Sequence, residues 1–248
     1  MNTRNVRAWS VLFWLLVWQL ASMAIGSDIL LVSPIKVLIR LWVLAGEADF
    51  WSSIARSFLR IGGGFLLACV CAVVLAALSA RFVHVCELLA PLVLAIQSTP
   101  VASFIILALI WFSSQSLAIL ISFLMVFPVI YANVLGGIRE ADRELLEMAQ
   151  VFRIPLARRL RFIYCPQVLP YFHSACTASL GLCWKAGVAA EVIGMPKGSI
   201  GEKLQQAKVY LDTPDLFAWT LVIVLVSLCF ERVFLLFLHY FGKCLENV

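Results

Sequence analysis

Six runs of apolar residues, each long enough to cross a lipid bilayer, constrain this chain more than any other feature of its sequence. A helix rises about 1.5 Å per residue, so about 20 apolar residues cross the roughly 30 Å hydrocarbon core of a bilayer. A chain in hydrocarbon must satisfy its own backbone hydrogen bonds, as a helix does. The sequence therefore predicts an all-α integral membrane protein with six transmembrane helices, at residues 8–25, 58–78, 88–112, 117–135, 167–190 and 217–238.

The composition excludes an ordinary soluble protein. The chain is 63% hydrophobic and 13% charged, and its mean hydropathy is +0.99. Soluble domains are about 45–50% apolar and about 25% charged. The net charge of +5 does not indicate nucleic-acid binding, because basic residues collect in a segment between two apolar runs, where membrane topology explains them. We expect contact with membrane lipid and no nucleic-acid partner.

The most basic part of the chain is residues 138–166, called here the basic segment, between the fourth and fifth predicted spans. It carries six of the chain's 19 Lys and Arg residues: Arg139, Arg143, Arg153, Arg158, Arg159 and Arg161. Basic loops of membrane proteins stay on the cytoplasmic side. With six spans, this rule predicts that both chain termini are also cytoplasmic.

Helical periodicity within the basic segment predicts two short amphipathic helices. In the first, apolar Leu145, Met148 and Phe152 are interspersed with polar residues, among them Glu144 and Glu147. Pro155 then interrupts the pattern and begins a second short element, since proline is tolerated in a first helical turn. Such helices at the inner face of a membrane suit contact with another protein.

The spacing within the segment resembles a known motif. Glu147-Met148-Ala149, three residues, Arg153, nine residues and Ile163-Tyr164-Cys165-Pro166 resemble the EAA loop of binding-protein-dependent ABC importer permeases, E-A-A, three residues, G, nine residues, I-x-L-P. Met148, Arg153 and Cys165 depart from it. A glycine in place of Arg153 would permit a left-handed turn, which other residues adopt rarely. Either Arg153 adopts that conformation or the turn is built differently.

This resemblance implies a type I importer permease in a bacterial cell membrane. The basic segment would be a cytoplasmic two-helix coupling loop that docks on an ATPase. The implied partners are two ATPase copies, an extracytoplasmic substrate-binding protein and a second permease copy in a homodimer. The chain has no GxxxxGK[ST] motif, so it is not expected to be an enzyme or to bind a cofactor, and its partner would use the ATP. The implied coupling residues are Glu144, Glu147, Ala149, Arg153, Pro155, Arg158, Arg159, Arg161 and Pro166.

The resemblance also divides the chain. Residues 1–50 would form the first span and an extracytoplasmic linker, 51–240 the transmembrane core domain, and 241–248 a short cytoplasmic tail. Three stretches, WKAGVAAEVIG, GSIGEKL and LDTPDLFAWTLVIVL, resemble the branch for nitrate, sulfonate and taurine, which also transports bicarbonate and thiamine-precursor pyrimidines. They do not choose among these substrates.

Polar residues inside the predicted spans are candidates for a substrate pathway. Gln97, Ser98 and Thr99 precede Pro100, which breaks or kinks the third helix, so they line a gate or satisfy the broken backbone. Lys185 would cost about 2.5–3.5 kcal/mol at the centre of a membrane helix. It lines a path that favours an anionic substrate, or it pairs with a residue such as Glu191, or it reaches toward an interface.

The polar region after the fifth predicted span is assigned a structural role. Glu191 stands where the family has an Ala-Glu pair, and we expect it to pin an outer loop that contains Gly198 and Gly201.

The alternative function is a secondary transporter or channel that needs no ATPase. Ion-coupled transporters carry carboxylates within their spans. Here Asp and Glu lie only near the ends of the predicted spans, which favours the importer. A membrane enzyme is disfavoured because no catalytic motif such as HExxH or GxSxG occurs.

Overall fold

The computed structural model describes residues 8–246, and within them the regular structure is entirely helical, as the sequence predicts. The elements in chain order are α1 (Ala8–Ile25), α2 (Pro34–Ala45), α3 (Ala48–Arg81), α4 (Val83–Ser98), α5 (Val101–Trp111), α6 (Ser114–Arg139), α7 (Arg143–Val151), α8 (Leu156–Arg159), the π-helical turn η2 (Leu160–Tyr164), α9 (Cys165–Gly194), α10 (Ile200–Val209) and α11 (Thr213–Glu246).

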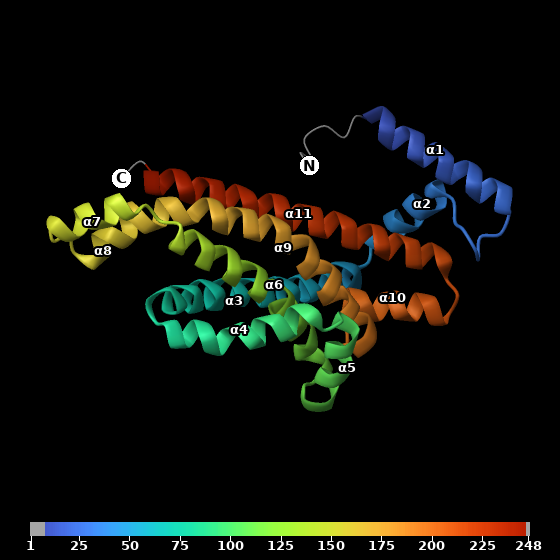
Figure 1. Ribbon diagram of the computed structural model, residues 1–248. Helices are drawn as coiled ribbons and strands as arrows, with labels where there is room; N and C mark the ends of the chain where they lie inside the picture. The colour runs from blue at the N-terminus through green and yellow to red at the C-terminus, as the bar shows by residue number, and fades with distance from the viewer. Residues whose placement is uncertain (1–7, 247–248) are drawn as a thin grey trace.

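The long helices extend along one direction and give the molecule two distinct ends. In Figure 1, α7 and α8 lie at one end with the α3–α4 connection and the C-terminal end of α11. We call this the basic end. The short helices α2 and α10 lie toward the other end, called the α10 end. Helix α1 runs along the outside of the molecule near α2.

Among the described residues, four helices are long and apolar enough to cross a membrane, and they correspond to four of the predicted spans. They are α3, α6, the continuous helix Leu156–Gly194 and α11. The α4–α5 pair makes a fifth if it counts as one span, although its two helices are bent by 109°. Helix α1 is a shorter apolar helix. A multi-pass membrane protein follows, whereas the number of six spans stays a prediction.

Two helices extend further than the predicted elements that they contain. The fifth span was predicted to begin at residue 167, but the helix begins at Leu156 and runs through η2 into α9 without interruption. Only α7 is therefore a separate short helix in the basic segment. The polar region after the fifth predicted span was expected to hold an outer loop, but α9 continues to Gly194 and α10 forms beyond it, capped by the Ser199 hydroxyl.

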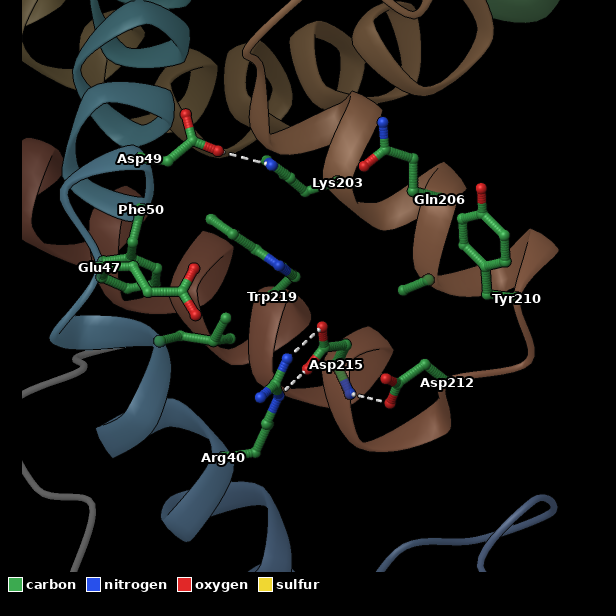
Figure 2. A pocket seen from close by; sticks show the side chains of 12 residues that line it. Arg40, Glu47, Asp49, Phe50, Lys203, Gln206, Tyr210, Asp212, Asp215 and Trp219 are labelled. Atoms are coloured by element: carbon green, nitrogen blue, oxygen red, sulfur yellow. Dashed lines mark hydrogen bonds and ion pairs between the residues drawn. The ribbon is translucent and has the colours of Figure 1, made fainter.

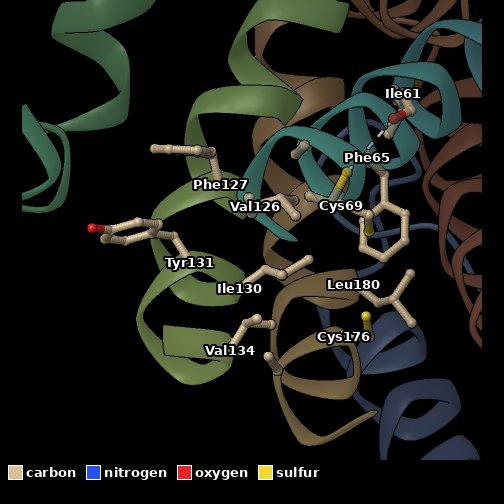
Figure 3. Close-up of a cluster of buried hydrophobic side chains, with 14 of the residues drawn as sticks. Ile61, Phe65, Cys69, Val126, Phe127, Ile130, Tyr131, Val134, Cys176 and Leu180 are labelled. Atoms are coloured by element: carbon tan, nitrogen blue, oxygen red, sulfur yellow. Dashed lines mark hydrogen bonds between the residues drawn. The ribbon is translucent and has the colours of Figure 1, made fainter. Parts of the chain in front are cut away.

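Helix α6 packs most closely against α3 and α9, and the main core lies among these three helices. Figure 3 shows side chains from all three meeting, with Phe65 and Cys69 of α3 facing Leu180 and Cys176 of α9. Much of the α3 face is made of small buried residues, namely Ala68, Ala72, Ala76, Ser53, Ser57 and Ser79. Small side chains let membrane helices approach closely enough for their backbones to make van der Waals contact.

Gly64 marks the closest approach of α3 to α6. A Cβ at this position would lie 2.5 Å from the Ile119 carbonyl oxygen and 2.9 Å from the Ser122 Cβ. The neighbouring Gly63 points into open space, with nothing within 4 Å of its would-be Cβ. An added side chain would therefore collide with α6 at Gly64 but would meet nothing at Gly63.

We predict that Gly64→Ala destabilises the protein by about 1–3 kcal/mol, because the added methyl group forces α3 away from α6. Gly63→Ala is the matched control, and we expect it to be neutral or slightly stabilising since alanine favours helix. Thermal unfolding in detergent, followed by fluorescence-detected size exclusion, compares the two variants. Equal melting temperatures for both would contradict the close α3–α6 contact.

Candidate functional site

The basic segment begins with a capped helix that is tied to α9. The Asp142 carboxylate accepts hydrogen bonds from the backbone N–H groups of Glu144 (2.9 Å) and Leu145 (3.5 Å), which caps α7. The Asp142 N–H in turn donates to Gln167 Oε1 (2.8 Å), a residue of α9. The start of α7 is thus fixed both to its own first turn and to the long helix beside it.

Helix α7 ends in a left-handed turn at Arg153, whose φ is +49°. The Ile154 N–H donates to the Ala149 carbonyl (2.9 Å), and the Arg153 N–H donates to the Gln150 carbonyl (3.0 Å). These two bonds form a Schellman motif, in which the left-handed residue is usually glycine. Of the two alternatives considered from the sequence, the first is therefore correct, because Arg153 itself adopts the left-handed conformation. A glycine would adopt this conformation more easily.

Arg159 closes this turn from the far side. Its Nε donates to the Ile154 carbonyl (2.8 Å) and its Nη2 donates to the Ala149 carbonyl (3.2 Å). A cation suits the end of a helix, where carbonyl groups are unsatisfied and the dipole is negative. Arg159 thus joins the end of α7 to α8. Arg158, by contrast, is exposed, and its side chain has no hydrogen bond or ion pair among the described residues.

The outward face of α7 and α8 carries both apolar and charged side chains. Only Ala149 of the predicted apolar face is fully buried, whereas Met148, Phe152 and Leu156 are 44%, 73% and 71% exposed. Glu144 and Glu147 are exposed beside them. Pro155, Arg161 and Pro166 are exposed too. An exposed apolar patch rimmed by charges marks a surface that contacts another molecule.

The π-helical turn η2 joins α8 to α9 just before Pro166, which lies in the first turn of α9. Proline lacks the N–H that would continue an α-helical ladder, and a π turn changes the hydrogen-bonding register locally. The sequence motif ending at Pro166 therefore marks a change of helix type, not a helix end.

The three polar residues before Pro100 lie at the break between α4 and α5. Thr99 Oγ1 (2.7 Å) and Ser98 Oγ (3.2 Å) both donate to the Ala95 carbonyl, which also accepts the Thr99 N–H (3.2 Å). Gln97, Ser98 and Thr99 also line a cavity of about 360 Å³ between the break, α6 and α9. This placement is compatible with both roles considered from the sequence, which are lining a gate and satisfying the backbone at the break.

Lys185 lies on the exposed face of α9, one helical turn from Leu182, which lines the same cavity. The Lys185 side chain has no ion pair or hydrogen bond in the described part of the chain, so the suggested pairing with Glu191 is wrong. A solitary cation within a long apolar helix faces either a water-filled space or another subunit.

Glu191 is fully buried where α9, α3 and α10 meet. Its Oε2 accepts from Ser57 Oγ (2.7 Å) and from the Gly201 N–H (3.3 Å), and its Oε1 lies 3.7 Å from Arg60 Nη1. A Cβ on Gly201 would lie 2.4 Å from the Glu191 Cβ, so glycine permits this approach. Gly198 turns the preceding chain with φ +67°. These contacts join the start of α10 to the membrane helices.

Sequence reasoning missed a polar cavity of about 300 Å³ at the α10 end, shown in Figure 2. Two ion pairs cross it. Arg40 of α2 makes a two-point pair with Asp215 of α11, which raises the pKa of the guanidinium, and Lys203 of α10 pairs with Asp49 of α3 (2.6 Å). Trp219 forms part of the lining. Arg40 and Asp215 are 175 residues apart, and no local pattern relates them.

Comparison with known proteins identifies a family over most of the chain. The family described as binding-protein-dependent transport system inner membrane component matches residues 64–243. This match begins within α3, continues through α4 to α10 and most of α11, and includes the whole of the basic segment.

Three relatives illustrate the range of named functions. The chain is 26% identical over 220 residues to the taurine transport system permease protein of Escherichia coli strain K12, covering 86% of this chain and 80% of that protein. It is 30% identical over 207 residues to a putative aliphatic sulfonates transport permease protein of the same strain, covering 79% and 75%. It is 22% identical over 218 residues to the formylaminopyrimidine transport permease protein of Halalkalibacterium halodurans, covering 88% and 86%.

We predict that Arg159→Ala loosens the turn after α7, because two carbonyl groups lose a cationic donor, each bond contributing about 1–2 kcal/mol. Hydrogen exchange followed by mass spectrometry measures the effect as faster exchange of the α7 amides, with α9 unchanged. Arg158→Ala removes an identical charge without a contact and serves as the control. If both variants exchange alike, Arg159 does not hold the turn.

Proposed function

Since this chain belongs to the family of binding-protein-dependent transport system inner membrane components, it is a permease subunit of an ABC importer, and we propose that its basic segment is the coupling loop. Membership in this family removes the alternative of a secondary transporter that works without an ATPase. The proposed role is transport of a small anionic solute into the cytoplasm by alternating access, driven by ATP that a partner subunit hydrolyses.

The observation that carries this proposal is the exposed face of α7 and α8. Met148, Phe152 and Leu156 offer apolar area, and Glu144 and Glu147 offer charge. An ATPase with an apolar cleft rimmed by basic groups would cover this face, with Arg158 and Arg161 at its edge. Pro155 starts α8, Pro166 marks the entry to α9, and Ala149 with Arg153 shapes the turn between α7 and α8.

Movement at this face has a direct path into the membrane. The turn after α7 is closed by Arg159, and α8 continues through η2 into α9, so Leu156–Gly194 is one helix of 39 residues. At about 1.5 Å per residue it is about 58 Å long. A displacement of α8 by the ATPase would move the same rigid helix that carries Lys185 and Glu191. The helix would move between two positions, and nucleotide bound to the ATPase would shift the equilibrium between them. This movement is the proposed basis of alternating access.

The proposed assembly contains two ATPase copies, a second copy of this permease and an extracytoplasmic binding protein in a bacterial cell membrane. The basic end would be cytoplasmic together with both termini, and residues 1–50 would form the first span and an outer linker. The cavity in Figure 2 would then face the binding protein. Glu191, Gly198 and Gly201 would hold α10 in place beneath it.

An anionic substrate is proposed from Lys185. This cation has no partner in the described chain and lies one turn from the cavity at the α4–α5 break, where Gln97, Ser98 and Thr99 would line the gate. No Asp or Glu lines that cavity. The named substrates of two relatives, taurine and aliphatic sulfonates, carry a sulfonate anion.

We predict that Glu147→Arg uncouples the transporter, lowering uptake at least about tenfold while the permease stays in the membrane, because a bulky reversed charge disrupts the docking surface. Uptake by vesicles and ATP hydrolysis by the purified complex are measured together. Glu87→Arg makes the same charge change at the basic end but outside the basic segment, and should leave coupling intact. Normal uptake by the Glu147 variant would sink the docking assignment.

We predict that Lys185→Gln lowers uptake of radiolabelled taurine about tenfold, since a buried anion loses a charge partner worth more than a neutral hydrogen bond. Lys185→Arg retains the cation and should retain most uptake. Full uptake by the Gln variant would show that Lys185 is structural. Failure of the parent protein to transport any sulfonate would instead reject the substrate class and leave the coupling proposal untouched.

A further inference from the structure

An apolar groove of about 390 Å³ runs between α4 and α6 in the half of the molecule near the basic end. Its walls are formed by Ala90, Val93 and Leu94 of α4 and by Ala132, Leu135 and Gly136 of α6. Tyr131 also lines it, but the Tyr131 hydroxyl is already bonded to Ser79 Oγ (2.9 Å). From Tyr131 to Arg139 the α6 wall rises about 12 Å. The groove therefore offers a long apolar surface with few free polar groups.

A cation closes the groove at its basic end. Arg139 lines this end, and the only hydrogen bond of its guanidinium within the described chain goes to Cys86 Sγ (3.1 Å), also a lining residue. No ion pair joins Arg139 to the adjacent Glu140 among the described residues, and the Glu140 carboxylate instead accepts from the Tyr171 hydroxyl. Arg81, at the end of α3, adds a second exposed cation just before α4 begins. The one nearby acidic residue on α4, Glu87, is paired with His84 (3.5 Å).

We propose that this groove binds an anionic phospholipid from the leaflet at the basic end. One acyl chain would lie along the apolar walls, and the phosphate would pair with Arg139. A bidentate guanidinium matches a phosphate in both charge and geometry. The surface beside the groove suits a second acyl chain, since Phe82, Val83 and Leu88 are 53%, 69% and 75% exposed.

The chemistry of the groove favours a lipid over a transported solute. A sulfonate has no long apolar part, and most of the groove would offer it no hydrogen-bond donor. Burying an anion without donors is unfavourable. The amphipathic shape, apolar along its length and cationic at one end, matches a lipid of the leaflet that meets the basic end.

The test uses the full-length permease purified with its partner subunits and analysed by native mass spectrometry with dioleoyl phosphatidylglycerol or dioleoyl phosphatidylcholine. We expect the parent to retain phosphatidylglycerol about five- to tenfold more strongly. Arg139→Gln should abolish this preference. Gly136→Leu should reduce retention of both lipids, because the new side chain enters the groove; a Cβ at this position meets nothing within 4 Å.

Matched controls separate this site from general effects. Arg232→Gln removes an exposed arginine of α11, and Gly63→Leu adds the same bulk at another open glycine on α3; both should behave like the parent. Equal retention of the two lipids by the parent would overturn the proposal. So would loss of the permease dimer, with unchanged lipid, in Gly136→Leu, because a second copy would then occupy the groove. Displacement of the lipid by millimolar taurine would also overturn it in favour of a solute.

Discussion

Close contact of α3, α6 and α9 is the constraint on which the other parts of this protein depend. In hydrocarbon there is little hydrophobic force to press helices together, so packing must come from backbones that approach closely. Gly64 lies against the backbone of α6, and alanines and serines form much of the buried face of α3. Larger side chains then fill the space between the helices, as Phe65 and Leu180 do. Helices α4, α5, α10 and α11 take their positions from this three-helix core.

The same core connects the two ends of the molecule through a single helix. Residues at the basic end determine how α8 is held, and Glu191 near the other end of the helix determines how α10 is held. Both attachments consist of polar contacts to backbone groups: Arg159 bonds to carbonyls, and Glu191 bonds to the Gly201 N–H. Between them lies one continuous helix of 39 residues. A rigid element fixed at both ends can carry a displacement without losing its own structure.

Much of this architecture could be predicted from sequence because hydrocarbon allows so few solutions. Apolar runs located α1, α3, α6 and α11, and the polar residues before Pro100 located the break between α4 and α5. What could not be predicted depends on contacts between distant residues. The pairing of Arg40 with Asp215 leaves no local pattern, and neither does the approach of Ser57 to Glu191. Pro166 hid the continuity of α8 with α9, because helical periodicity alone interprets this proline as the boundary of a helix. The π turn η2 accommodates the proline within one continuous helix.

Arg153 shows how a departure from a motif can still preserve the geometry that the motif describes. A left-handed residue other than glycine costs about 1–2 kcal/mol. The turn nevertheless forms, because the Schellman bonds and the Arg159 side chain together satisfy the carbonyl groups at the end of α7. Leu211 adopts the same conformation after α10, with the Asp212 N–H bonded to the Ala207 carbonyl. In both turns the backbone hydrogen bonds fix the conformation and the side chain adapts to it. The spacing of the motif therefore matters more to this segment than the glycine does.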